Sequence, residues 1–169
     1  RRPADARGHG DSTLRTSGGT IDYREFKTSG EGSQWQSMIS DLRSAVMYLK
    51  ATYSLPVSRI AVGGASLGAN IALVYASENP EVRGLILLSP GLQYAGIMSE
   101  PAFRDYGTRP VLMASSFGDT YAHTSVQQLS ALRSDKACVV IEAQGSGHGV
   151  NLLNETVTPK LLDWIKQVR

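Results

Sequence analysis

The stretch that decides the fold is RIAVGGASLGAN, residues 59–70. In this stretch a short apolar run leads into glycines, and an alanine-rich segment follows them. One serine, Ser66, stands between Gly64 and Gly68 in the pattern G-x-S-x-G. The simpler interpretation is a glycine-rich turn that joins a buried strand to a helix. The alternative is that the turn presents Ser66 as a nucleophile, and the rest of the chain must decide between the two.

Four apolar runs are typical of buried strands. The first covers residues 59–64, and the second, residues 83–90, is continuously apolar, as parallel strands covered on both faces are. The runs 109–119 and 137–149 begin apolar and end in a turn and a glycine loop. These four runs predict a buried, parallel sheet.

Helical patterns separate the apolar runs. Ser33 and Gln36 form a capping box, and apolar residues at helical spacing continue to about residue 52. A second helix is expected from Ser66 to the segment ENP, and Thr158 and Pro159 predict the N-cap and first residue of the last helix. The residues expected to face the core from the last two helices are Val126, Leu129 and Leu132, then Leu161, Leu162, Ile165 and Val168.

The alternation of strand and helix favours one α/β domain over residues 1–169, with a mostly parallel sheet flanked by helices on both faces. The net charge is +2 with both signs interspersed, so no nucleic-acid partner is expected. No apolar run is long enough to predict a membrane span. Cys138 lies in an apolar stretch and is expected in the core rather than as a reactive thiol. The compartment stays open, with the cytoplasm as the default.

Three reactive residue types follow the predicted strands. Ser66 follows the first strand, Asp119 the third and His148 the fourth. Because the carboxyl ends of parallel strands meet at one edge of a sheet, we expect these side chains to lie together. A serine hydroxyl needs a base, and the base needs an acid that orients it, so the three residues predict a hydrolytic triad.

The spacing around Ser66 suits this chemistry. A strained strand-to-helix turn lifts the hydroxyl out of the sheet, and side chains at Gly64 and Gly68 are expected to collide with neighbouring backbone. The backbone N–H of Leu67 is the expected oxyanion donor, helped by the positive end of the helix. A plain loop role remains the alternative for each site residue: backbone bonding for His148 and helix capping for Asp119.

Two other histidines compete with His148 as the base. His9 lies in an early loop rich in Gly, Ser and Thr, and His123 lies near a helix start, where a solvent-facing or capping role is expected. His148 is preferred because glycines flank it at the end of a strand. The histidines are far apart in sequence and no C-x-x-C or H-E-x-x-H occurs, so neither a metal nor an organic cofactor is expected.

Four segments together resemble the α/β-hydrolase fold of serine esterases, over almost the whole chain. DARGHGDS (5–12) is similar to the segment after the fourth strand of that fold, GASLG (64–68) to its nucleophile elbow, FGD (117–119) to its acid turn and GSGHG (145–149) to its histidine loop. The resemblance implies roles for Ser66, Asp119 and His148 as nucleophile, acid and base. It also implies that Asp5, Arg7 and His9 brace the loop beside the site.

Two departures from this family carry expectations. Only residues 91–109 connect the second and third strands, so we expect a short cover that includes Tyr94 and Ile97 as substrate-binding residues, and small, short-acyl esters as substrates. The strands that normally precede DARGHGDS are not seen, and RRPA (1–4) is too polar to replace one. The chain is therefore expected to be N-terminally truncated, with residues 59–63 as an edge strand that self-association or residues 1–30 would cover.

The sequence leaves three functions open. A carboxylesterase is preferred, and a thioesterase, lactonase, peptidase or acyltransferase would use the same three residues. An inactive remnant that binds a partner is the third, because the family's second oxyanion donor comes from the segment not seen here. An N–H near Gly18 and Gly19 is a conceivable substitute donor, although no sequence mark supports it.

Overall fold

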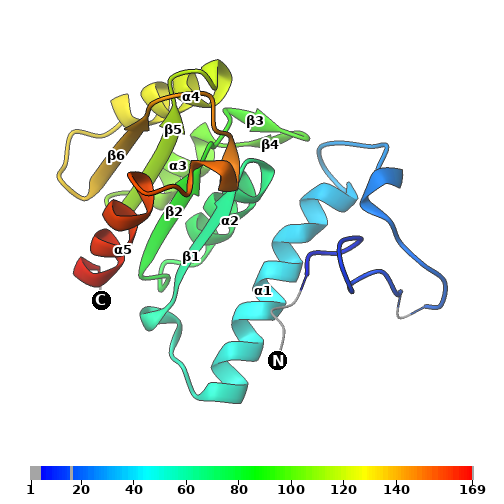
Figure 1. The fold of residues 1–169 in the computed structure, drawn as a ribbon. Coiled ribbons are helices and arrows are strands. Elements are labelled where there is room, and N and C mark those ends of the chain that lie inside the picture. The colour runs from blue at the N-terminus through cyan, green and yellow to red at the C-terminus, as the bar shows by residue number, and fades with distance from the viewer. Residues whose placement is uncertain (1–4, 16, 169) are drawn as a thin grey trace.

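A four-stranded parallel sheet lies at the centre of the computed structural model, which describes residues 5–15 and 17–168 (Figure 1). The segment RRPA lies outside the described residues. The strands are β1 (Ala61–Ala65), β2 (Gly84–Leu88), β5 (Val111–Ser116) and β6 (Cys138–Ala143), and they are adjacent in that order. Each pairs in parallel with its neighbour, which confirms the predicted sheet.

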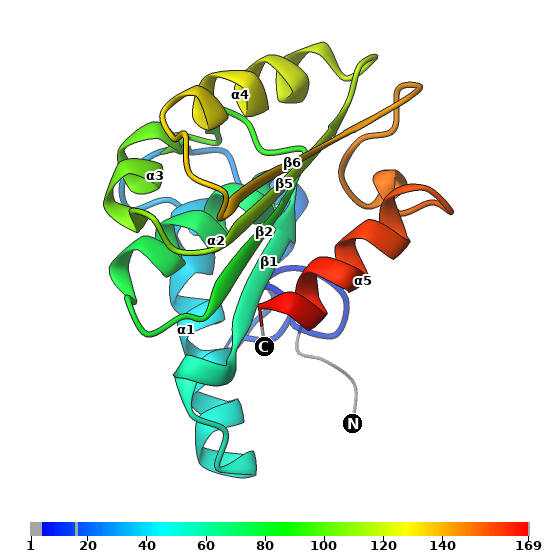
Figure 2. The same cartoon turned by 90° about the vertical axis from the view of Figure 1, so that its left-hand side faces the viewer.

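Helices cover both faces of this sheet (Figure 2). One face carries α1 (Gln34–Tyr53), α2 (Leu67–Glu78), α3 (Glu100–Tyr106) and α4 (Thr120–Ala131), and the other carries α5 (Val157–Gln167). A small antiparallel hairpin, β3 (Gln93–Tyr94) with β4 (Ile97–Met98), precedes α3. Three short 3-10 helices lie at Tyr23–Glu25, Val57–Arg59 and Gly149–Leu152.

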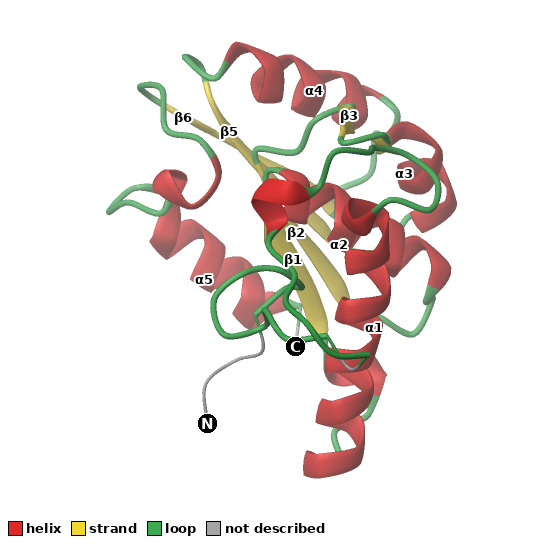
Figure 3. Ribbon diagram, turned by 90° about the vertical axis from the view of Figure 1, so that its right-hand side faces the viewer, coloured by secondary structure: helices red, strands yellow, loops and turns green. Residues whose placement is uncertain are grey.

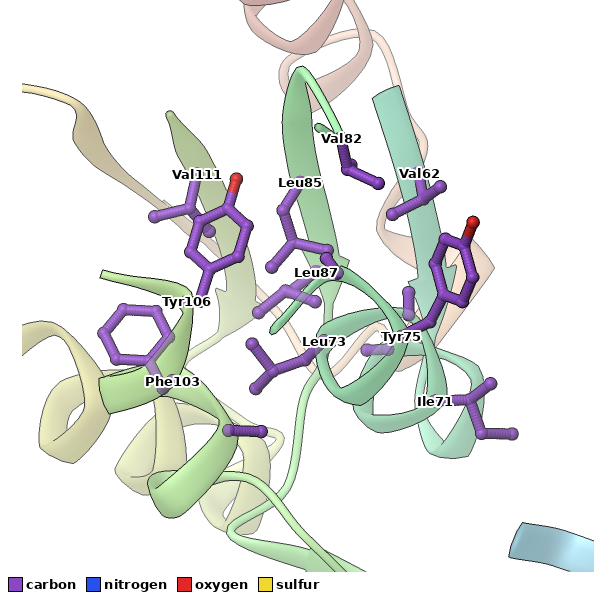
Figure 4. Packing of buried hydrophobic residues seen from close by; sticks show 14 of the residues in the cluster. Val62, Ile71, Leu73, Tyr75, Val82, Leu85, Leu87, Phe103, Tyr106 and Val111 are labelled. Carbon is purple, nitrogen blue, oxygen red and sulfur yellow. The ribbon is translucent and has the colours of Figure 1, made fainter. Parts of the chain in front are cut away.

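The core follows the alternation of side chains along the strands. In β2, Leu85 and Leu87 face α2 and α3, whereas Leu88 joins the cluster under α5. Figure 4 shows the first cluster, in which Phe103 and Leu73 pack against the strands from α3 and α2. Because both faces are covered, the strands are apolar on both sides, which explains the continuous apolar runs.

The helix ends agree with the sequence pattern in one case and differ in another. Ser33 caps α1, accepting a hydrogen bond from the Gln36 N–H at 3.1 Å, as predicted. The prediction that Thr158 caps α5 is wrong. The side chain of Asn154 accepts hydrogen bonds from the N–H groups of Thr156 and Val157, so the helix begins before Thr158. The start of α5 is therefore set by the turn at Asn154 and not by the Thr158–Pro159 pair.

One predicted core residue of α5 lies outside the core. Leu162 is 49% exposed, whereas Leu161, Ile165 and Val168 pack against the second cluster. Trp164 instead supplies the buried side chain of this helix, at 6% exposure. Cys138 is half-buried beside the first cluster, and burial raises the pKa of its thiol, which disfavours the reactive thiolate.

Strand β1 forms an edge of the sheet, since among the described residues it pairs only with β2. Residues 5–15 and 17–33 are mainly loop and run beside β1 and α1 without joining the sheet (Figure 3). The expectation that residues 59–63 form an edge strand is thus met, and residues 5–30 do not pair with it. A cleft of about 440 Å³ lies between the N-terminal loop, α1 and β1.

Candidate active site

Ser66 occupies a strained turn between β1 and α2. Its backbone has φ 55° and ψ −126°, a conformation that non-glycine residues adopt only at a cost of about 1–3 kcal/mol. Its N–H donates to the carbonyl of Leu88 at 2.8 Å, so the parallel ladder continues up to the turn itself. The Ser66 side chain makes no capping bond to the helix that follows, which leaves its hydroxyl available for other partners.

The two flanking glycines differ in how much space they have. A Cβ at Gly64 would lie 2.0 Å from the carbonyl oxygen of Gly68, so only glycine fits there. A Cβ at Gly68 would meet nothing within 4 Å among the described residues, so the expected collision at that position is wrong. The peptide group between Gly68 and Ala69 therefore packs against Gly64, whereas the side-chain position of Gly68 itself faces open space.

Leu67 is the first residue of α2, and its N–H therefore has no intrahelical acceptor. The N–H groups of Ala69 and Asn70 turn back onto the carbonyl of Ser66. The Leu67 N–H is thus placed next to Ser66 and at the positive end of a 12-residue helix. This is the arrangement expected of an oxyanion donor.

Asp119 and His148 meet beyond the carboxyl ends of β5 and β6. The Oδ2 of Asp119 and the Nδ1 of His148 lie 2.6 Å apart. An ionised carboxylate only accepts, so Nδ1 carries the proton and Nε2 is left free to act as a base. Asp119 precedes α4 yet makes no capping bond with its side chain, so the capping alternative is not the one found. The Asp119 side chain is 14% exposed and that of His148 is 44% exposed.

Two buried serines, absent from the sequence prediction, hold the histidine loop in place. The Ser116 hydroxyl donates to the carbonyl of Gly147 at 2.7 Å, and the Ser89 hydroxyl accepts from the N–H of Gly149 at 2.9 Å. These two bonds clamp the backbone on either side of His148. Ser89 and Ser116 end the apolar runs of β2 and β5. A polar residue at the end of an apolar strand is the sequence pattern that could have identified them.

The other histidines have other partners. The ring of His9 stacks on Tyr23 with centroids 4.1 Å apart, and its Nδ1 lies 3.0 Å from the carbonyl of Arg7. His123 lies in the first turn of α4, where its ring packs against Phe117 and its Nδ1 is 3.9 Å from a carboxylate oxygen of Glu142. Neither histidine has a geometry that orients it as a base toward Ser66, and His123 is neither a cap nor fully exposed.

The N-terminal loop is fastened to α1. The Arg7 guanidinium binds the carboxylate of Asp41 through two nitrogens, at 2.6 and 2.8 Å. Asp5 accepts from the N–H of Asp11 at 2.9 Å and closes the loop on itself. These contacts give Asp5 and Arg7 the bracing role that the resemblance implied. Gly18 and Gly19 lie in an exposed turn and do not line the cleft beside Ser66, so they supply no donor there.

The two residues expected to cover the site have different fates. Tyr94 reaches the site: its ring meets that of His148 edge to face, with the ring centroids 6.5 Å apart. Burial raises the pKa of Tyr94, and the neighbouring Ser66 hydroxyl opposes this effect. Ile97 is only 5% exposed and packs into the core, so its expected role as a substrate contact is wrong. The hairpin turns Ile97 inward because its other face, with Met98, is the exposed one.

The cleft beside Ser66 is mostly apolar. Its walls include residues 63–68 of the turn, the side chains of Trp35, Met38 and Leu42 from α1, and His9 from the N-terminal loop. It follows the open side of β1 and lies away from Asp119 and His148, which do not line it. No three His, Cys, Asp or Glu side chains gather as a metal site within residues 5–15 and 17–168. None of the helices in that part of the chain combines the length and apolarity needed to cross a membrane.

Known structures resemble this fold at low sequence identity. The Pyrococcus furiosus esterase Pf2001 aligns with 20% identity and a TM-score of 0.72, over 96% of this chain and 68% of its own. A Bacillus cereus carboxylesterase aligns with 17% identity and a TM-score of 0.59, over 85% of this chain and 68% of its own. A point variant of Arabidopsis thaliana SOBER1 aligns with 13% identity and a TM-score of 0.61, over 90% of this chain and 77% of its own. These likenesses establish the α/β-hydrolase fold.

A search among proteins of curated function found no match. The family model described as serine aminopeptidase, S33, matches residues 3–140 and so covers most of the chain. The matched region includes the turn at Ser66 and the acid turn at Asp119, and it stops before the loop of His148. On this match, the chain belongs to the serine aminopeptidase S33 family of α/β-hydrolases.

Proposed function

We propose that this protein is a serine hydrolase that cleaves small carboxylic esters through Ser66, His148 and Asp119. The observation that carries the proposal is the 2.6 Å contact between Asp119 and His148, which leaves Nε2 of the histidine as the free base. The strained, uncapped Ser66 at the same edge of the sheet supplies the nucleophile. Stability alone would favour an unstrained turn and a helix with a side-chain cap, so these two features support a functional role for the site.

The chemistry runs in two stages. The Ser66 hydroxyl attacks the ester carbonyl carbon while its proton passes to Nε2 of His148, and Asp119 stabilises the imidazolium. The carbonyl oxygen becomes an oxyanion that accepts from the Leu67 N–H. The tetrahedral species then expels the alcohol, which takes the proton from His148, and an acyl-enzyme remains. Water, activated by His148, attacks that acyl group and releases the acid.

The size of the cover favours small substrates. Between β2 and β5 the chain forms only the β3–β4 hairpin and the seven-residue helix α3. His148 keeps 44% of its side chain exposed, so the scissile group meets the site from solvent rather than through a deep tunnel. Two of the structural relatives described above, from Pyrococcus furiosus and Bacillus cereus, are named as an esterase and a carboxylesterase, which supports an ester over an amide.

A peptidase is the second candidate, because the matching family is described as serine aminopeptidase. An aminopeptidase must recognise a free α-amino group, which requires a carboxylate near the nucleophile. Asp5 and Asp41 line the cleft at Ser66, but Asp41 is already bound by Arg7 and Asp5 by a backbone N–H. This pairing favours the ester reaction, and a thioesterase, lactonase or acyltransferase would use the same three residues.

The experiment that tests the proposal compares the purified chain with Ser66→Ala. We expect hydrolysis of p-nitrophenyl acetate and butyrate by the wild type and none above background in the variant. Labelling by a fluorophosphonate probe should likewise require Ser66. An alanine p-nitroanilide substrate separates the peptidase, since cleavage of the amide faster than the ester would favour it. Equal traces of ester hydrolysis in both proteins would favour the inactive remnant.

A further inference from the structure

Ser89, directly after β2, has an unfavourable backbone conformation for its place in the sequence. It is fully buried, and its φ is 49°, in the left-handed region that residues other than glycine seldom adopt. Pro90 follows it, and the residue before a proline is normally extended. Conformations of this kind cost stability and persist where the surrounding structure holds them, often at functional sites. The end of a strand does not by itself require one.

With this backbone, the hydroxyl of Ser89 reaches the histidine loop. Its Oγ accepts from the N–H of Gly149 at 2.9 Å, although 60 residues separate the two in the chain. The N–H of Ser89 donates to the carbonyl of Ala114 in β5 at 2.8 Å, so the ladder of the sheet continues through Ser89. Gly149 is buried and directly follows His148. One side chain thus fixes the backbone of the base to the end of an inner strand.

The same strand end also holds the nucleophile turn. The N–H of Ser66 donates to the carbonyl of Leu88, the residue before Ser89, at 2.8 Å. The turn and the histidine loop also pack together directly, because a Cβ at Gly149 would lie 3.4 Å from the Cβ of Ala65. Two consecutive residues of β2 and its end therefore bind the nucleophile turn through the first and the histidine loop through the second.

Other bonds hold the histidine loop to the acid turn. The Ser116 hydroxyl, at the end of β5, donates to the loop backbone at 2.7 Å, and Asp119 binds the ring of His148 at 2.6 Å. Both join the loop to β5 and to the turn that follows it. The bond from Ser89 differs, because it joins the loop to the strand that holds Ser66. Without it, the acid and the base would stay paired, but their distance from the nucleophile would be less well fixed.

We propose that Ser89 is a positioning residue that sets the distance between His148 and Ser66. The inference rests on the proposed function, in which these two residues are the base and the nucleophile. Proton transfer requires the two groups to be held within hydrogen-bond reach, and a displacement of about 1 Å at a reacting centre costs about 100-fold in rate. A backbone conformation that lowers stability is thus retained because it raises the rate.

The test measures kcat and KM of Ser89→Ala and Ser89→Gly with p-nitrophenyl acetate, below the melting temperature of each variant. Both remove the acceptor for the Gly149 N–H, and glycine also relieves the left-handed strain. We expect kcat to fall about 10- to 100-fold in both, with KM nearly unchanged, although Ser89→Gly should melt at the higher temperature. The matched control is Ser115→Ala, which removes a buried hydroxyl 3.5 Å from Nδ1 of His123 and should keep the wild-type kcat.

The pH profile of kcat/KM separates a change in position from a change in the base itself. Because Asp119 still binds the ring of His148, the midpoint of the profile should stay at the wild-type pH in both variants of Ser89. A wild-type kcat in either variant, or a shifted midpoint, would overturn the inference and leave the proposed function standing. A wild type no faster than Ser66→Ala would overturn the proposed function, and the role of Ser89 with it.

Discussion

The carboxylate of Asp119 and the imidazole of His148 lie 2.6 Å apart although 29 residues separate them in the chain. The contact joins the ends of adjacent strands, since Asp119 follows β5 and His148 follows β6. It assigns the proton of the ring to Nδ1, so in the proposed mechanism Asp119 selects the tautomer and stabilises the imidazolium. Removing this carboxylate is therefore the most direct test of the proposed site.

Asp119→Asn should lower kcat on p-nitrophenyl acetate by about 1,000- to 10,000-fold, because the amide permits the wrong tautomer of His148. The matched control is Asp163→Asn, at an exposed ion pair with Lys166 on α5, which should leave kcat unchanged. Both variants should melt within a few degrees of the wild type by circular dichroism. Activity of Asp119→Asn near the wild-type value would remove Asp119 from the mechanism.

The two glycines of the turn should respond in opposite directions to alanine. Gly64→Ala forces a Cβ against the carbonyl of Gly68 and should lower the free energy of unfolding by about 1–3 kcal/mol or more. Gly68→Ala places a methyl group in open space within a helix and should raise it by about 0.5–1 kcal/mol. Urea unfolding of the two variants measures both effects, and a similar loss in the two would contradict this distinction.

Gly91→Ala should move Tyr94 without changing any reactive group. The added Cβ meets the rings of Tyr94 and Tyr121 at less than van der Waals distance, so one ring must shift. We expect kcat on the acetate ester to fall about 10-fold or more, because small displacements at a reacting centre are costly. Labelling of Ser66 by a fluorophosphonate should still reach completion at long times. Retention of the full kcat would mean that the position of Tyr94 does not matter.

Much of this fold is readable from the sequence because its causes are local. The apolar runs at 83–90 and 109–119 and the capping box at Ser33 depend on neighbouring residues alone, and all appear in the structure. The serines that clamp the histidine loop depend on the order of the strands, because Ser89 after β2 and Ser116 at the end of β5 both reach the loop that follows β6. Ile97 was misassigned for the same reason, since its burial follows from how the hairpin docks on α2.

Tyr106 predicts a pH dependence of stability in the alkaline range. Burial raises its pKa from 10.0 to about 12, and its hydroxyl donates to the carbonyl of Pro110 at 2.6 Å. The folded state thus holds this proton more tightly than the unfolded state. The contribution is complete below pH 10 and is lost as the pH rises toward 12, by roughly 2–3 kcal/mol at about 1.4 kcal/mol per pKa unit.

Tyr106→Phe separates this contribution from that of the other tyrosines. Between pH 10 and 12 the free energy of unfolding, measured by urea denaturation, should change less with pH in the variant than in the wild type. Tyr48→Phe, at a half-exposed position on α1, is the control and should keep the wild-type slope. Parallel curves for Tyr106→Phe and the wild type would show that Tyr106 is not the group responsible.

The open edge of β1 predicts self-association of this 169-residue chain. The carbonyl of Ile60 and the N–H of Ser66 both bond toward β2, so in the alternating ladder Ala61, Gly63 and Ala65 direct their backbone groups to the open side. We propose that a second copy of the chain pairs with this edge.

The test is Ala61→Pro, which removes one outward N–H and leaves the hydrogen bonds between β1 and β2 intact. Light scattering should then show an oligomer for the wild type and a monomer for the variant, whereas a monomeric wild type would contradict the proposal.

The order β1-β2-β5-β6 is the same along the chain and across the sheet, so each crossover adds the next strand at one growing side. Ser66 directly follows the first strand of this sheet, and His148 lies in the loop that follows its last strand. Under the proposed chemistry, Ser66 gains its reactivity only when β6 has docked. Reaction with an organophosphate during refolding would then report when the sheet is complete, so the proposed nucleophile would also be a probe of folding.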